Sequence, residues 1–129
     1  MKSKLGAVLA VAVGLLVVAG PMLAHHSASM YDSEHVTTVT GTVTEFYFAN
    51  PHSQIYFEVK DDKGNVEKWT AVSGPPSRLH RTGWDRNTIK PGDQIIVSGR
   101  RAKDGSKVMT LQKIMLNGQE VRGAGGNID

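Results

Sequence analysis

Apolar and polar residues alternate along much of the chain after residue 35, which is the pattern of strands with one buried face. The alternation is cleanest over residues 53–60, where every second residue is a large apolar one. Before it, residues 36–48 are rich in β-branched and aromatic side chains and also predict a strand. The apolar positions of this first strand change phase partway along. We therefore expect a bulge or bend between Gly41 and Glu45.

Turn-forming residues divide the rest of the chain into shorter elements. A hairpin turn over residues 61–64 leads into a third predicted strand, 66–72. Consecutive prolines at 75 and 76 then favour one or two helical turns ending at Gly83. Further turn signals predict strands at 94–99 and 107–116, and a short edge strand at 119–122.

This order predicts an all-β fold with a short helical connection. Five strands in a chain of this length close most readily into a small OB-like barrel, and an open sandwich of the same strands is the alternative. The predicted core consists of the apolar residues on the inward positions: Val39, Val43, Phe46, Phe48, Ile55, Phe57, Val59, Trp69, Leu79, Ile95, Val97, Leu111 and Ile114.

The first 24 residues form a pattern of their own. Two lysines precede an apolar run over residues 5–20, Pro21 breaks it, and Ala24 offers a small residue for cleavage. This is the order of an export signal, so we expect a periplasmic or secreted protein whose mature chain begins at His25. The apolar run is shorter than the roughly 20 residues of a spanning helix, and we expect no stable membrane insertion after cleavage.

The predicted organisation is a signal peptide (1–24), a lead-in (25–34), an OB-like barrel (35–122) and a flexible glycine-rich tail (123–129). Two of the 15 Lys and Arg lie in the leader, which leaves 13 against 12 Asp and Glu. Acids dominate residues 25–67 and bases dominate 78–103, which we interpret as two solvated faces that attract each other, with an anion-binding patch as the alternative. Export and near-neutral mature charge predict that nucleic acid is not a partner.

The histidines suggest one chemical site. All five lie outside the leader: His25, His26, His35, His52 and His80. A mature terminus at His25 presents an amine and an imidazole on one residue, and the amine has an ordinary pKa of only about 7.7–8. Nitrogen ligands suit copper(II), zinc or nickel, and the thioether of Met30 suits copper(I).

We therefore expect a transition metal, copper foremost, bound by His25 and His26 with His52 or His35 as a further ligand. His52 is favoured because it follows Asn50-Pro51, which stiffens its position. The alternatives for these histidines are structural. The terminal histidine pair can bind nothing specific. His52 can hydrogen-bond a backbone carbonyl, and His80 can be solvated.

A different class of function rests on the basic segment 78–86. Arg78, Arg81 and Arg86 with Trp84 would form a recognition surface for a small anionic ligand or an envelope protein, and the histidines would then be incidental. Trp84 can alternatively belong to the core. The chain has no cysteine, no nucleophile elbow and no phosphate-binding glycine loop, so the sequence gives no indication of an enzyme. A purely structural envelope protein is the third interpretation.

Several short motifs occur together in a fixed order over the mature chain. They are His25-His26-Ser27, Tyr31-Asp32, Gly41-Thr42-Val43, Asn50-Pro51-His52-Ser53, Trp69, Leu79-His80-Arg81-Thr82-Gly83-Trp84, Pro91-Gly92-Asp93 and Asp104-Gly105-Ser106. This set resembles a family of small exported bacterial proteins known only as a domain of unknown function. The resemblance implies a leader, a histidine pair directly after it and a compact β-domain. It implies no activity and no cofactor.

Overall fold

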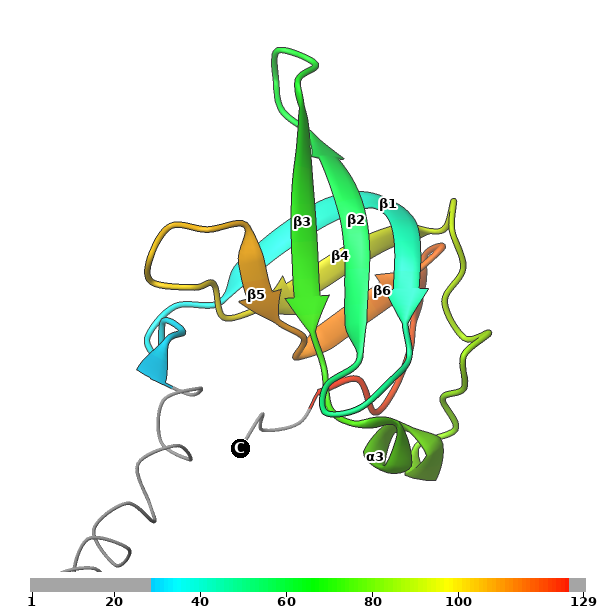
Figure 1. Ribbon diagram of the computed structural model, residues 1–129. Helices are drawn as coiled ribbons and strands as arrows, with labels where there is room; N and C mark the ends of the chain where they lie inside the picture. Colours follow the sequence, from blue (N-terminus) through cyan, green and yellow to red (C-terminus); the bar gives the residue numbers. More distant parts are fainter. Residues whose placement is uncertain (1–28, 126–129) are drawn as a thin grey trace, which may run out of the picture.

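The computed structural model describes residues 29–125 (Figure 1). The predicted leader, His25, His26 and residues 126–129 lie outside this range. The elements are β1 (Thr37–Tyr47), β2 (Gln54–Lys60), β3 (Val66–Val72), α3 (Pro76–Arg81), β4 (Gln94–Gly99), β5 (Val108–Thr110), β6 (Lys113–Leu116) and β7 (Gln119–Glu120). The prediction of a mostly-β fold with one short helical connection is confirmed within this range.

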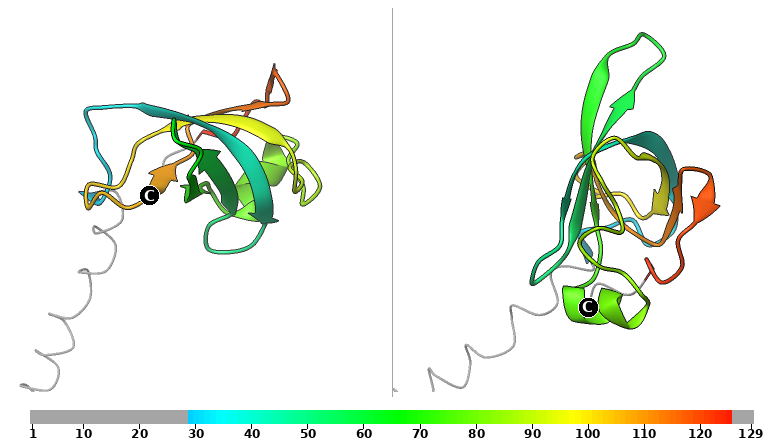
Figure 2. Two further views of the ribbon diagram at one scale, coloured as in Figure 1. Left: turned by 90° about the horizontal axis from the view of Figure 1, so that it is seen from above. Right: turned by 90° about the vertical axis from the view of Figure 1, so that its right-hand side faces the viewer.

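The strands form one strongly curved sheet in the order β5-β3-β2-β1-β4-β6-β7 (Figure 2). β1, β2 and β3 are an antiparallel meander, β4 returns antiparallel to β1, and β5 runs parallel to β3. The segment after β5 crosses from one side of the sheet to the other. The backbone N–H of Leu111 donates to Val72 in β3 (2.7 Å), and that of Gln112 donates to Ser98 in β4 (2.9 Å). The ladder is not a closed ring, but its two sides meet here in an OB-like arrangement.

Two details of the strands differ from or refine the prediction. The expected fifth strand is divided into β5 and β6 because its first half pairs with β3 and its second half with β4. The expected bulge is present, since the pairing of β1 with β2 shifts register between Val43 and Glu45. Gly99 ends β4 where a Cβ atom would overlap the carbonyl oxygen of Thr110, so only glycine allows this close approach of the two segments.

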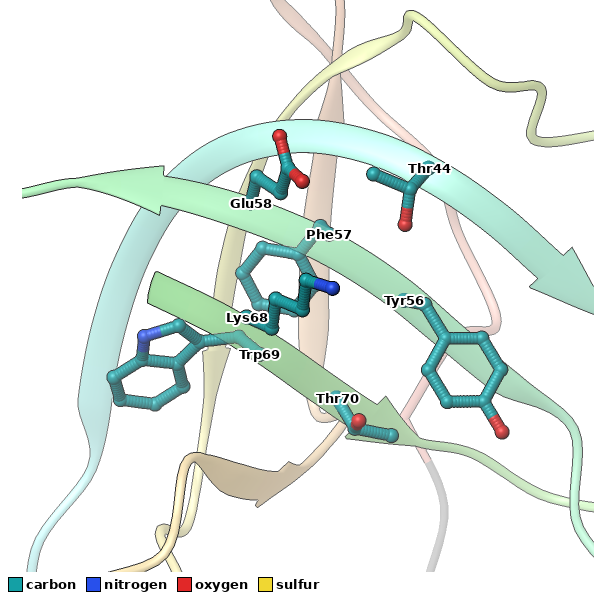
Figure 3. A pocket seen from close by; sticks show the side chains of 7 residues that line it. All are labelled: Thr44, Tyr56, Phe57, Glu58, Lys68, Trp69 and Thr70. Atoms are coloured by element: carbon teal, nitrogen blue, oxygen red, sulfur yellow. The ribbon is translucent and has the colours of Figure 1, made fainter. Parts of the chain in front are cut away.

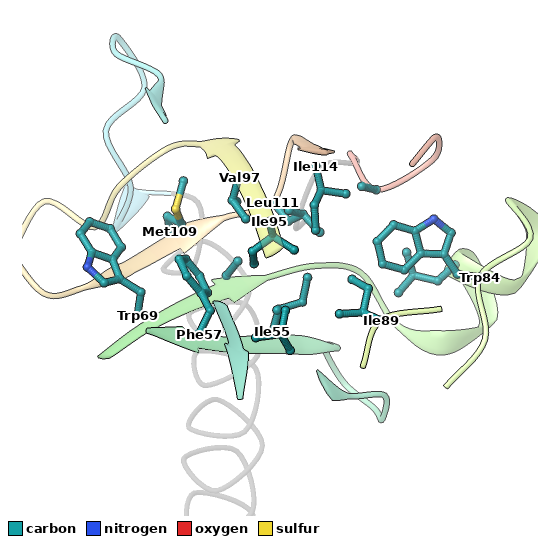
Figure 4. Packing of buried hydrophobic residues seen from close by; sticks show 14 residues of the cluster. Ile55, Phe57, Trp69, Trp84, Ile89, Ile95, Val97, Met109, Leu111 and Ile114 are labelled. Carbon is teal, nitrogen blue, oxygen red and sulfur yellow. The ribbon is translucent and has the colours of Figure 1, made fainter. Parts of the chain in front are cut away.

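Every predicted core residue belongs to the hydrophobic core or packs against it. Figure 4 shows the buried residues of this core. Val39, Phe46, Phe48 and Val59 are only partly buried, whereas the other nine are buried. The prediction missed Ala71, Trp84, Ile89, Met109 and Ala124, which are also buried in the core. Trp84 and Ile89 lie in the irregular segment between α3 and β4, where no periodicity in the sequence reveals burial.

Both flanking segments are attached to the sheet as far as the structure describes them. In the lead-in, the Asp32 N–H donates to Arg101 (2.9 Å) and the carbonyl of Met30 accepts from Lys103 (2.9 Å). At the other end, Ala124 is buried and its carbonyl accepts from the Ser73 hydroxyl (3.2 Å). The start of the tail predicted to be flexible is therefore packed against the barrel, and the remainder of that prediction falls on residues outside the described range.

The charged halves of the chain do not pair with each other in residues 29–125. The ion pairs there are Asp32–His35, Glu67–Lys107 and Glu120–Lys113. None of them joins an acid of residues 25–67 to a base of residues 78–103. The predicted attraction between the acidic and the basic segment therefore does not take the form of ion pairs within the described residues.

One of these pairs belongs to a network around Trp69. Glu67 accepts hydrogen bonds from Lys107 (2.8 Å) and from the Trp69 indole (3.1 Å). The cationic groups of Arg101 and Lys107 lie 5.2 and 5.3 Å from the Trp69 ring centroid. Both hydrogen bonds lower the pKa of Glu67 below its ordinary value of 4.5, and the one from Lys107 has the larger effect.

This shift predicts an acid-sensitive contribution to stability. Because the folded pKa of Glu67 is the lower one, its contribution is present above pH 4.5 and is lost as the pH falls through the folded pKa. The free energy of unfolding in urea is measured at pH 7 and at pH 3. It should fall less between these two pH values for Glu67→Gln than for the unmodified protein. An equal difference for both proteins would show that the network makes no pH-dependent contribution.

Candidate functional site

The lead-in holds a hydrogen-bonded pair of candidate ligands, Asp32 and His35. One carboxylate oxygen of Asp32 accepts hydrogen bonds from the backbone N–H groups of Glu34 (2.8 Å) and His35 (3.2 Å). These two hydrogen bonds form a tight Asx-type turn. The other carboxylate oxygen lies 2.9 Å from Nδ1 of His35. The backbone hydrogen bond from Glu34, followed by the contact with His35, lowers the pKa of Asp32.

This contact fixes the tautomer of the neutral His35 ring. A carboxylate accepts but does not donate, so Nδ1 carries the proton and Nε2 carries the lone pair. The side chain of His35 is 75% exposed, and Nε2 is the ring atom left for a ligand. The exposed thioether of Met30 belongs to the same lead-in, five residues before His35. The lead-in thus presents an oriented imidazole close in sequence to His25 and His26, which themselves lie outside the described residues.

His52 occupies a different environment, in the connection between β1 and β2 after a cis Asn50-Pro51 peptide. Its ring is half-buried, and Nδ1 is fully buried without a hydrogen-bond partner among residues 29–125. The neighbouring hydroxyl of Ser53 is buried and unpartnered in the same way. The predicted hydrogen bond of His52 to a backbone carbonyl is therefore not made through Nδ1. Buried polar atoms of this kind are commonly satisfied by a water or a bound ion.

The structure does not bring His35 and His52 together. His35 precedes β1 and His52 follows it, and the 11 residues of β1 separate them at about 3.3 Å per residue. Over residues 29–125, no group of three or more His, Asp or Glu side chains is placed to hold a metal ion. His80 is exposed, with its ring edge-on to Phe48 at 5.1 Å between centroids. A site built from three such side chains would need a residue outside the described range, where His25, His26 and Asp129 are the candidates.

The basic segment 78–86 lacks the exposed aromatic ring that its predicted role as a recognition surface requires. Trp84 is only 2% exposed, its ring packs edge-on to Phe46, and its indole N–H donates to the carbonyl of Arg122 (2.8 Å). Of the two alternatives for Trp84, the structure thus supports the core position and contradicts the ligand-stacking one. Arg78, Arg81 and Arg86 are exposed, the first two on α3 and the third in the following loop.

A shallow hollow that the sequence did not suggest lies on the outer face of the meander (Figure 3). Its volume is about 190 Å³. The side chains that line it are Thr44, Tyr56, Phe57, Glu58, Lys68, Trp69 and Thr70. The polar residues at alternate positions of β2 and β3 indicated a solvent-facing side of the sheet. That they surround one hollow depends on the bulge in β1, which places the exposed Thr44 beside β2.

Fold and site together define a small OB-like β-domain with an ordered lead-in that carries a histidine. The model of a family described as "Family of unknown function (DUF6152)" matches residues 11–111. The chain therefore belongs to this family, which confirms the predicted resemblance to a family of unknown function. A search of curated proteins found no match. No helix within residues 29–125 has the length and apolar character needed to cross a bilayer.

Solved structures with a similar fold include two that are named for nucleic acids. One is TiaS in a complex with a tRNA and ATP, at 22% identity and a TM-score of 0.43, where the match covers 64% of this chain but 18% of TiaS. Another is a small single-stranded DNA-binding protein from Streptomyces coelicolor, at 16% identity and a TM-score of 0.43, where the match covers 66% of this chain and 95% of that one. At these values the likeness concerns the fold alone, and the chain spans less than a fifth of TiaS.

These neighbours correct one prediction. The sequence-based statement that nucleic acid is not a partner is wrong as an exclusion, because proteins of similar fold are named as a tRNA complex and as a single-stranded DNA-binding protein. The physical reason is that net charge and export describe the whole chain, whereas ligand contact depends on individual surfaces of the fold.

Proposed function

We propose that this protein is an exported small binding protein of the cell envelope that holds a transition metal ion, copper foremost. The proposed ligands are the amine and imidazole of His25, the imidazole of His26, and Nε2 of His35. The observation that supports this proposal is the contact between Asp32 and His35 at 2.9 Å. A carboxylate behind a histidine is the usual partner of a metal-bound imidazole, because it fixes the ring and raises its basicity.

Chain length favours His35 over His52 as the ligand that joins the terminal histidines. His25 lies four positions before Ser29, the first described residue, and four Cα–Cα steps span at most about 14 Å in any conformation. The hydrogen bonds of Met30 and Asp32 hold the lead-in at residues 101–103, on the side of the sheet where β1 begins. His52 lies beyond the far end of β1. The proposal therefore replaces His52, the ligand favoured by the sequence, with His35.

The donor set supports copper over harder ions. An amine and two or three imidazoles suit copper(II), and the exposed thioether of Met30 provides a softer ligand for copper(I). The proposed role is carriage, buffering or delivery of the ion outside the cytoplasm, in the periplasm or the secreted medium. A binding role needs no substrate surface beside the metal.

Copper titration of histidine variants tests this proposal. His35→Gln should lower the affinity for copper(II) at least about tenfold, since it removes one nitrogen ligand. Asp32→Asn should lower it about tenfold, because the ring loses the partner that orients it. The measurement is competition with a chelator of known affinity, using protein that begins at His25.

Two other histidines provide matched controls. His52→Gln and His80→Gln change the same side chain at sites away from the lead-in, and both should keep the affinity of the unmodified protein. If His52→Gln weakens binding and His35→Gln does not, the proposed ligand set is wrong. If none of the four variants changes the affinity, copper binding by the lead-in is contradicted.

A further inference from the structure

The outer face of the meander carries polar and aromatic side chains in three adjoining cross-strand rows. The pairing of β1, β2 and β3 places Thr42, Glu58 and Lys68 in one row, Glu45, Tyr56 and Thr70 in the next, and Tyr47, Gln54 and Val72 in the third. Thr44 stands beside the middle row at the bulge. The hollow described above lies between the first two rows, with Phe57 and Trp69 of the core as its floor (Figure 3).

The charged groups at this hollow have no partners within residues 29–125. Glu58 and Lys68 are directly opposite across β2 and β3, but they form no ion pair with each other or with another described residue. In Figure 3 the Lys68 side chain extends over the hollow towards Thr44 and Tyr56. A hydrogen-bond donor, a carboxylate acceptor and two hydroxyl groups are therefore available around one space.

The aromatic side of the hollow is formed by Tyr56, whose ring is half-buried. Its phenol donates a hydrogen bond to the side-chain oxygen of Gln54 (2.9 Å), which orients the ring. Tyr47 is opposite Gln54 on the same face and is 46% exposed. Two tyrosines thus lie on one diagonal of the sheet surface, and such rings supply contact area at low entropic cost.

We infer that this face binds a glycan, with one neutral or zwitterionic sugar unit in the hollow and its neighbour over Tyr47. A sugar ring has an apolar C–H face, which fits against tyrosine, and hydroxyl edges, which hydrogen-bond to Glu58, Lys68 and the threonines. The hollow of about 190 Å³ is smaller than the roughly 300–1,000 Å³ of pockets that enclose whole small ligands, so it accommodates one unit of a longer chain.

The charge of this face decides between polymer classes. A single-stranded nucleic acid binds through a positively charged groove with one phosphate per nucleotide to neutralise. Here the face carries two lysines, Lys68 and the exposed Lys60 of the next row, and two carboxylates, Glu58 beside Lys68 and Glu45 in the row of Tyr56. The balance of charge suits a ligand without a polyanionic backbone. This inference concerns a surface separate from the lead-in and does not depend on the proposed metal site.

Titration with defined polymers tests the inference. The secreted product of the full chain is titrated with a tetramer of β-1,4-linked N-acetylglucosamine, with maltotetraose and with a dT12 oligonucleotide, and amide chemical shifts and binding heats are recorded. At least one of the two oligosaccharides should shift amides of β2 and β3, and Tyr56→Ala should weaken that binding at least tenfold. Glu58→Gln, which leaves the aromatic surface intact, should weaken it less.

Two further variants control for the position of the substitution and for folding. Lys113→Met removes a cation from β6, which lies elsewhere in the sheet, and should leave oligosaccharide binding unchanged. Tyr47→Ala alters an exposed residue and gives a second aromatic variant should Tyr56→Ala fold poorly. The inference is overturned if neither oligosaccharide shifts this face, if both tyrosine variants bind as before, or if dT12 occupies the face in preference to both sugars.

Discussion

Replacing Trp84 with alanine is expected to lower the free energy of unfolding by about 3–5 kcal/mol. The ring is only 2% exposed and packs in the core with Phe46, so truncation leaves a large cavity. The same change frees the carbonyl of Arg122, which accepts the indole N–H. That hydrogen bond joins the C-terminal segment to the loop after α3. Urea unfolding followed by circular dichroism measures the effect.

Two variants separate the packing of the Trp84 ring from its hydrogen bond and from the exposed surface around it. Trp84→Phe keeps an aromatic ring and removes the hydrogen bond, and it should destabilise the protein by less than the alanine variant. Arg81→Ala changes an exposed neighbour of the same segment and should stay within about 0.5 kcal/mol of the unmodified protein. A Trp84→Ala protein as stable as the unmodified one would contradict the buried position of this side chain.

Adding Gly-Pro before His25 is expected to weaken copper(II) binding by about 100-fold or more. In the proposed site the amine and the imidazole of His25 bind the same ion, and the extension moves the amine away from that imidazole. The added proline has no backbone N–H, so the new terminus cannot form a replacement chelate through its peptide nitrogens. Linking two binding groups contributes about 10²–10⁴ in affinity, so separating them should cause a loss of this order. The extended and unextended proteins are compared by chelator competition at about pH 7.5, where the amine loses its proton readily.

The control for this experiment is Gly-Pro added after Asp129, which changes the length equally and should leave copper affinity unchanged. A protein with the N-terminal Gly-Pro that binds copper as tightly as the unextended one would contradict chelation by the amine. In that case His35 and the imidazoles of His25 and His26 would still be testable as ligands through the variants described above.

Much of this fold follows from the periodicity of the sequence. Alternation defines the meander of β1, β2 and β3, and the change of phase between Gly41 and Glu45 marks the bulge, because a shift of one residue exchanges the faces of a strand. The division of the last long strand into β5 and β6 does not follow from the sequence. It arises from crossing between β3 and β4, a tertiary contact that local residues do not encode.

The candidate site was predictable only in part. The residue types predicted His35 as a candidate ligand, but its contact with Asp32 depends on a turn that brings two residues three positions apart face to face. The stiffness of Asn50-Pro51 favoured His52 as the further ligand of the terminal histidines. The distance from the lead-in to His52, however, is set by the length and direction of β1. Trp84 lies in a segment without periodicity, so its sequence was equally compatible with core and surface.

The most direct test of the proposed function is to isolate the protein after export by its own host, measure its intact mass and determine its bound metals in the same preparation. We predict a mass corresponding to residues 25–129 and a stoichiometric content of copper, which is lost on acidification as the amine and imidazoles are protonated. A product that begins at another residue, or one that starts at His25 but takes up no copper when the ion is supplied, would contradict the account.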